Sequence, residues 1–168
     1  MKTFLIFLLT IICSQSGSAQ TIDFDKIKFQ GLTSSSSKEL IIEKLGSPET
    51  VYEPNYECGF LSSEEQSKNF STLDYTNFKF TGNETDNYIL NEICFNNESI
   101  VLNYAEYQLN SKTDIKTLVE IFNEDSFLTL PSDTGVVIVP NKNKTQEDGF
   151  GFEIKNGKLI SIHYWSPC

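Results

Sequence analysis

Two stretches of the chain place apolar residues at helical spacing, and strand-like segments follow each of them. The first stretch predicts a helix near residues 37–45, and its apolar positions are Leu40, Ile41, Ile42 and Leu45. The second predicts a helix near residues 113–123, with apolar positions at Ile115, Leu118, Val119 and Phe122. Helices this short are marginally stable alone, so each apolar face is expected to pack on the strands.

Polar residues and a glycine define the ends of both predicted helices. Ser36 and Glu39 have the S-x-x-E spacing of a capping box, which predicts that the first helix begins after Ser36. Gly46 suits the left-handed residue that commonly follows a helix. The second helix is expected to be capped by Thr113 or Ser111.

Strands are predicted wherever polar and apolar residues alternate between turn-forming residues. Their ranges are 23–29, 49–53, 71–80, 87–95, 99–109, 127–130, 135–139, 149–155 and 158–165. The polar segment Thr81–Asp86 predicts a hairpin turn, and Asn156-Gly157 is the strongest hairpin signal in the chain.

The second half of the chain echoes the first. Residues 90–95 and 159–164 both read L-x-x-I-x-aromatic, preceded by Phe78-Lys79-Phe80 and Phe150-Gly151-Phe152. The pattern predicts an α+β protein of two tandem repeats, each a short helix packed on antiparallel strands. The repeats are predicted over residues 20–97 and 98–168. The alternative is chance similarity between two amphipathic hairpins.

Residues 1–19 have the features of an export signal peptide. Lys2 is followed by the apolar run Phe4–Cys13, and small residues at Ser16–Ala19 suit cleavage before Gln20. The run is too short to span a bilayer, so no stable membrane insertion is expected after cleavage. The mature protein is therefore predicted to be exported, either periplasmic or secreted.

The charge of the chain disfavours nucleic acid as a partner. The formal net charge is −10, and all 13 basic residues are lysines. Nucleic acids and phosphate ligands are bound through positive potential and forked guanidinium contacts, which this composition does not supply.

Export predicts an oxidising compartment, where disulfides persist. Removal of Cys13 leaves three of the four cysteines. A bridge is predicted between Cys58, in a loop, and Cys168, at the terminus, because both can adjust to the separation a disulfide requires. Cys94 lies in a predicted strand and is expected to stay free. The pairs Cys58–Cys94 and Cys94–Cys168, or three free thiols, are the alternatives.

Neither a catalytic site nor a metal or cofactor site is predicted. His163 is the only histidine, and no nucleophile signature accompanies it. One histidine and three separated cysteines match no zinc spacing. The acidic loop over residues 54–68 lacks the ligand spacing and glycine turn of a calcium loop.

Aromatic residues are the candidate binding positions. Amphipathic rings suit protein interfaces, and strand alternation would direct one set of side chains away from the helices. The candidates are Tyr52, Tyr56, Phe60, Tyr75, Tyr107 and Trp165. The alternative is that these rings complete the core.

The order of elements resembles known envelope proteins. A polar cap, a short helix, Leu45-Gly46-Ser47-Pro48, strands and a final L-x-x-I-x-F strand resemble the small outer-membrane assembly lipoprotein family (SmpA/OmlA). Two such copies resemble the β-lactamase-inhibitor-protein-like fold. The second copy departs from the pattern with Phe122–Asp125, and Cys13 does not match the family's lipid-attachment cysteine. The resemblance implies an envelope or secreted protein that acts by binding, and it assigns no functional residue.

The predicted function is that of an exported, non-enzymatic binding or cell-envelope module acting on a protein partner. The alternatives are a secreted or envelope hydrolase with paired carboxylates, and a small-ligand carrier. A deep pocket with facing carboxylates would favour the hydrolase. An aromatic sheet face would favour the protein partner, and an enclosed apolar cavity would favour the carrier. The sequence does not specify the partner or the oligomeric state.

Overall fold

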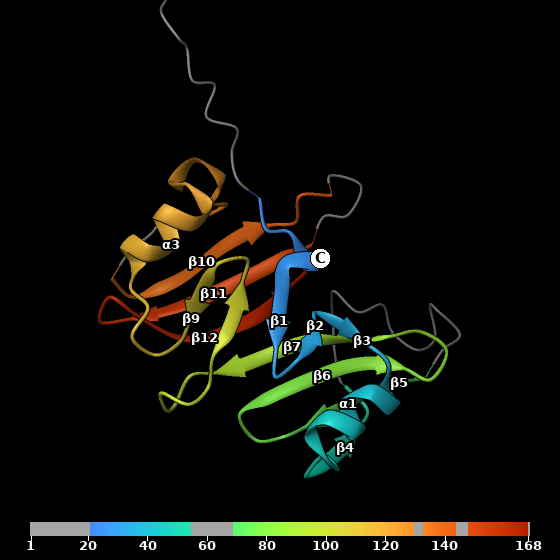
Figure 1. Cartoon of the computed structure of the whole chain (residues 1–168). Coiled ribbons are helices and arrows are strands. Elements are labelled where there is room, and N and C mark those ends of the chain that lie inside the picture. The colour runs from blue at the N-terminus through green and yellow to red at the C-terminus, as the bar shows by residue number, and fades with distance from the viewer. Residues whose placement is uncertain (1–20, 55–68, 130–132, 144–147, 168) are drawn as a thin grey trace, which may run out of the picture.

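The computed structural model describes residues 21–54, 69–129, 133–143 and 148–167. The predicted export segment 1–19 and the predicted bridge residues Cys58 and Cys168 lie outside these ranges. The described residues form a mixed α+β structure of antiparallel strands and two α-helices (Figure 1).

An eight-stranded antiparallel sheet is the largest element, with strand order β10-β11-β12-β7-β6-β5-β4. Its strands are β4 (Thr50–Tyr52), β5 (Phe70–Asp74), β6 (Phe78–Asn83), β7 (Tyr88–Cys94), β10 (Gly135–Pro140), β11 (Gly149–Lys155) and β12 (Lys158–Trp165). The eighth strand, β3 (Ser35–Ser36), pairs with the first residues of β7.

A second, four-stranded sheet has the order β2-β1-β8-β9. Its strands are β1 (Ile27–Phe29), β2 (Leu32–Thr33), β8 (Leu102–Tyr104) and β9 (Tyr107–Leu109). It packs on the large sheet through Phe29 of β1, whose ring centroid lies 4.9 Å from that of Phe78 on β6.

The two α-helices are α1 (Lys38–Leu45) and α3 (Ile115–Phe122). Ser37 caps α1 and Asp114 caps α3, so the predicted caps are wrong. The predicted residues have other partners. The Ser36 hydroxyl donates to the Thr33 carbonyl, and the Thr113 hydroxyl accepts from the amide of Asn110.

Both helices lie on the same side of the large sheet as the small sheet (Figure 1). Phe122 of α3 contacts Phe152 of β11, with ring centroids 5.3 Å apart. The carbonyl of Gly46, at the end of α1, accepts a 3.0 Å hydrogen bond from Tyr75, which stacks on Phe78. We call this side, which carries Phe78, Phe80, Ile93, Phe152 and Ile162, the packed face.

The helices bury fewer residues than their apolar stripes predict. Ile41, Leu118 and Phe122 are buried as expected. Leu40, however, is 38% exposed, so its predicted burial is wrong. Leu45, Ile115 and Val119 are only half-buried. An eight-residue helix places little more than one side chain per turn directly over a sheet, and the flanking positions of the stripe remain at the margin.

Two predicted strands are each divided into two in the structure. The range 71–80 is divided into β5 and β6 by a turn in which Asp74 Oδ1 accepts from the amide of Thr76. The range 99–109 is the hairpin β8–β9, with a left-handed residue at Ala105 (φ 51°). Each continuous alternation therefore conceals a turn.

Two other predicted strands differ less. The range 23–29 is a 3-10 helix, Phe24–Lys26, followed by β1. The described part of 127–130 is not a strand, although the Leu128 amide donates to the Ile138 carbonyl on β10. The hairpin at Asn156-Gly157 is confirmed, with φ of 52° and 71° at the two turn residues.

The two L-x-x-I segments are neighbours at the centre of the sheet, where Ile93 of β7 pairs with Ile162 of β12. The hairpins β6–β7 and β11–β12 each have a register shift at the same point of this motif. Asn91 and Ile160 are the extra residues, as in a β-bulge. In the structure, Phe78 and Phe152 occupy equivalent positions, because they pair with Ile93 and Ile162. The sequence echo instead aligns Phe78 with Phe150, two residues earlier.

We expect Leu118→Ala to lower the free energy of unfolding by about 2–5 kcal/mol, because it leaves a cavity beneath α3. Leu40→Ala is the matched control, with an expected change within about 0.5 kcal/mol at an exposed position. Urea unfolding of both variants measures the difference. Equal losses would contradict this packing.

Candidate functional site

A row of charged and polar residues crosses the large sheet on the side opposite the helices, which we call the polar face. Residues in register on adjacent strands lie side by side on one face. The row runs through Asp74 (β5), Lys79 (β6), Glu92 (β7), His163 (β12) and Gly151 (β11). Alternation places these residues opposite the packed face, and we call them the charged row.

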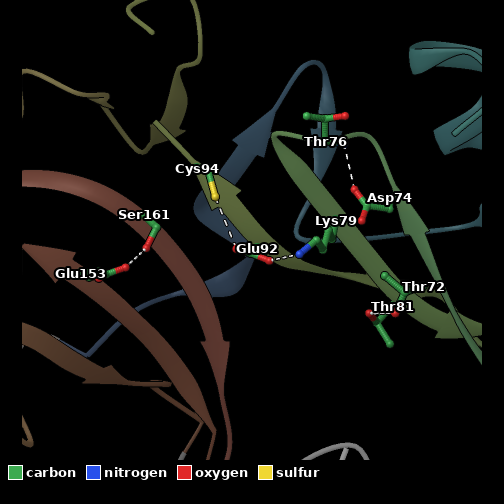
Figure 2. Close-up of polar contacts among 9 residues, drawn as sticks. All are labelled: Thr72, Asp74, Thr76, Lys79, Thr81, Glu92, Cys94, Glu153 and Ser161. Atoms are coloured by element: carbon green, nitrogen blue, oxygen red, sulfur yellow. Dashed lines mark hydrogen bonds and ion pairs between the residues drawn. The ribbon is translucent and has the colours of Figure 1, made fainter. Parts of the chain in front are cut away.

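Lys79 and Glu92 form the centre of the charged row. Lys79 Nζ lies 2.5 Å from Glu92 Oε2, and Cys94 Sγ donates to the other carboxylate oxygen at 3.3 Å (Figure 2). Burial acts to raise the pKa of Glu92, but the hydrogen bonds from Lys79 and Cys94 leave it below its usual value. The hydrogen bond to Glu92 raises the pKa of Lys79. Both groups are therefore charged at neutral pH.

Cys94 is a free thiol within the described part of the chain. Burial, together with the hydrogen bond to Glu92, raises its pKa to about 11. The thiolate is the nucleophilic form of cysteine, and this environment suppresses it at neutral pH.

His163 lies over Gly151 at the end of the charged row. A Cβ atom on residue 151 would lie under 3.0 Å from two atoms of the imidazole, Nε2 and Cε1, so the ring occupies the space that glycine leaves. Burial lowers the pKa of His163, while the carboxylates of Glu153 and Glu92 act in the opposite direction. The imidazole is accordingly neutral at pH 7.

Ser161 and the threonines of β5 and β6 complete the polar face. The Ser161 hydroxyl donates to Glu153 Oε2 at 2.7 Å, and the buried hydroxyls of Thr72 and Thr81 are 2.8 Å apart (Figure 2). Among the hydrogen bonds between described residues, none joins His163 to Ser161 or Cys94. Neither of these two potential nucleophiles is therefore hydrogen-bonded to the histidine.

A groove of about 370 Å³ lies along the charged row. Its lining residues are Tyr52, Pro54, Lys79, Asn91, Glu92, His163 and Tyr164. It offers an ammonium, a carboxylate, an amide and a phenol, which suit polar contacts with a bound chain. Within the described ranges, no three His, Cys, Asp or Glu side chains are grouped so that they could hold a metal ion.

The predicted aromatic residues are dispersed. Tyr52 is 43% exposed and lines the groove. Trp165, two residues beyond His163 on β12, lies on the same face by alternation. Tyr75 stacks on Phe78 of the packed face, and Tyr107 lies in the small sheet, so neither is at the groove. Tyr56 and Phe60 are outside the described residues.

The sequence analysis did not single out Lys79, Glu92, Glu153 or Ser161. Each of these residues neighbours an apolar residue of the packed face in its strand, and this alternation marks a polar sheet position. Grouping them required the strand order and both register shifts, which the sequence pattern does not supply.

Comparisons of the chain with protein-family models, curated proteins and solved structures found no match. None of the helices in the described ranges has the length and apolar character needed to cross a membrane. The envelope-protein resemblance accordingly rests on the sequence pattern alone.

We expect Gly151→Ala to lower the free energy of unfolding by about 1–3 kcal/mol, because the added methyl overlaps the His163 ring. In a His163→Ala background the same change should cost little, since the ring is gone. Urea unfolding of the two single variants and the double variant measures this coupling. Additive losses would contradict the placement of the ring.

His163 should make stability depend on pH. Because its folded pKa lies below the ordinary value of 6.5, the unfolded chain binds the proton more readily. The contribution of His163 to stability is complete above pH 6.5 and declines as pH falls below it. Urea unfolding at pH 7.5 and 5.5 should show a smaller loss for His163→Gln than for the unchanged protein. The pKa of Glu92 is lowered, so this carboxyl titrates below the pH range of the measurement. Equal losses of stability in the two proteins would refute the assignment of the pH dependence to His163.

Proposed function

We propose that the protein is an exported, non-enzymatic binding module that receives a protein partner on its polar face. The single observation that carries this proposal is the groove along the charged row, with Tyr52 in its wall. Tyrosine and tryptophan are enriched at protein interfaces, and Trp165 lies on the same face of the sheet. Export remains the inference from residues 1–19, and a periplasmic or secreted location is part of the proposal.

The titration of the site favours binding over hydrolysis. A carboxylic acid that acts as a general acid has a raised pKa, whereas the pKa of Glu92 is lowered. Cys94 is a thiol at neutral pH, and Ser161 donates to Glu153 instead of to a histidine. The carrier alternative is also less favoured, because the Lys79–Glu92 ion pair in the groove wall is unsuited to an apolar ligand.

We further propose that the chain consists of two copies of one unit, over residues 20–97 and 98–168. Each half has the order hairpin, helix and antiparallel strands, and the halves meet where β7 pairs with β12. The shared bulge in the L-x-x-I segment supports this relation. The groove would then lie at the junction, with Lys79 and Glu92 from one copy and His163 from the other.

The Cys58–Cys168 disulfide, with Cys94 free, stays a prediction from the sequence. Peptide mapping of the exported protein without reduction tests it. A peptide that joins Cys94 to either of the other cysteines, or three thiols that all react with an alkylating reagent, would refute it.

Photo-crosslinking tests the proposed function. A benzoylphenylalanine in place of Tyr52, in the exported full chain, should form an adduct with a protein of the cell envelope or the medium. The same substitution at Tyr107 is the matched control, because this tyrosine lies away from the groove. An excess of the unsubstituted chain should suppress the Tyr52 adduct. The proposal fails if both positions give the same adducts, or if Tyr52 gives none.

A further inference from the structure

We propose that acid closes the groove, because protonation moves the imidazole of His163 from its position against Gly151 into the space along the charged row. This inference rests on the proposed function, since it concerns access of the partner to the same groove. Its basis is the position of one side chain, which both lines the groove and lies against a glycine of the neighbouring strand.

The glycine beneath His163 lies in the interior of the sheet. Gly151 is on β11, which pairs with β10 on one side and with β12 on the other. A glycine inside a strand packs no side chain and often marks a place where another group approaches closely. Here that group is the imidazole, because a Cβ atom on residue 151 would lie under 3.0 Å from Nε2 and Cε1. The ring therefore lies low against the sheet, and the space open to it is above, in the groove.

This position suits a neutral ring only. Among the described residues, no hydrogen bond reaches the imidazole of His163, and burial lowers its pKa. An imidazolium pressed against Gly151 would carry a charged N–H group that has no acceptor there. Leaving a buried charged donor without a partner costs more than moving it to an acceptor. Protonation therefore favours a ring that leaves the glycine.

Two carboxylates attract the protonated ring from above the sheet. Glu92 on β7 is in register with His163, and Glu153 on β11 is its diagonal neighbour. The charges of both act to hold a proton on His163. Strand side chains stand roughly perpendicular to the sheet, so both carboxylates reach higher than a ring that lies against Gly151.

Glu92 is the nearer of the two acceptors and lies in the wall of the groove. It already accepts from Lys79 Nζ at 2.5 Å and from Cys94 Sγ at 3.3 Å (Figure 2), and Asp74 lies beyond Lys79 in the charged row. An ionised carboxylate has about four acceptor positions, so Glu92 can receive the imidazolium and keep both partners. A ring that turns toward Glu92 lies between β12 and β7, within the groove that both residues line.

The groups on the β11 side of His163 do not draw the ring away from the groove. The exposed Lys155 lies two residues from Glu153 on the same face, and Lys158 is in register beside it, so two lysines offset this carboxylate. On β10, the residues that face this side are Val136 and Ile138, which carry no charge. The protonated ring therefore moves toward β7 and occupies part of the groove.

Proton NMR of the full chain follows the ring directly. An aromatic ring that lies against a glycine shifts the α-proton resonances of that glycine upfield. We expect Gly151 to show this shift at pH 7.5 and to lose it as the pH falls to 4.5, with the same midpoint as the titration of the His163 imidazole. Gly149 is the matched control, because it lies on the same strand and face but not beneath His163, so its α-protons should keep their shifts.

Photo-crosslinking connects the position of the ring with access to the groove. The chain with benzoylphenylalanine at Tyr52 should lose its adduct at the pH at which His163 is protonated. In a His163→Gln background the side chain is neutral at every pH, so the adduct yield should not fall with pH. Gly151→Ala should lose the adduct even at pH 7.5 in samples that NMR shows to be folded, because its methyl group keeps the ring off the sheet.

Three results would overturn the inference: titration of His163 without loss of the Gly151 shift, no titration of His163 above pH 4.5, or an equal fall in adduct yield with His163→Gln. If the ring moves but the adduct persists, closure of the groove is refuted and the proposed function stands. If Tyr52 gives no adduct at any pH, the proposed function fails, and the NMR titration still decides whether the ring moves.

Discussion

The pairing of β7 with β12 is the interaction on which the remainder of the large sheet depends. In the described sheet it joins the strands that precede residue 97 to those that follow it. Ile93 and Ile162 pair there and are both buried on the packed face. The same pairing brings Glu92 and His163 together on the polar face, so one register determines both the core and the candidate site.

The sequence predicts those features that depend on local chemistry. Asn156-Gly157 specifies its hairpin because both residues tolerate positive φ, and Gly46 ends α1 for the same reason. The predicted helix caps were wrong by at least one residue. The hydroxyls of Ser36 and Thr113 form hydrogen bonds with backbone groups of the preceding turns instead. Local patterns locate an element well, but competing hydrogen bonds determine where it begins.

The candidate site could not be assembled from the sequence, because it depends on non-local register. The bulge at Asn91 brings Glu92 opposite Lys79, and the bulge at Ile160 brings His163 opposite Gly151. The sequence echo aligns Phe78-Lys79-Phe80 with Phe150-Gly151-Phe152. This alignment differs by two residues from the one that the paired strands show. A bulge leaves no unique residue pattern, so only the paired strands reveal it.

The charged row contributes little to folding stability, so stability alone does not explain its presence. The Lys79 and Glu92 side chains are 27% and 32% exposed, and ion pairs that solvent can reach contribute at most about 1 kcal/mol. His163 is held neutral by burial, so protonation destabilises the fold, and its ring requires a glycine beneath it. Threonine or valine would suit these strand positions better if stability alone were selected. Polar groups that add little to stability and surround a groove are more readily explained by contact with another molecule, which is the reasoning behind the proposed binding function.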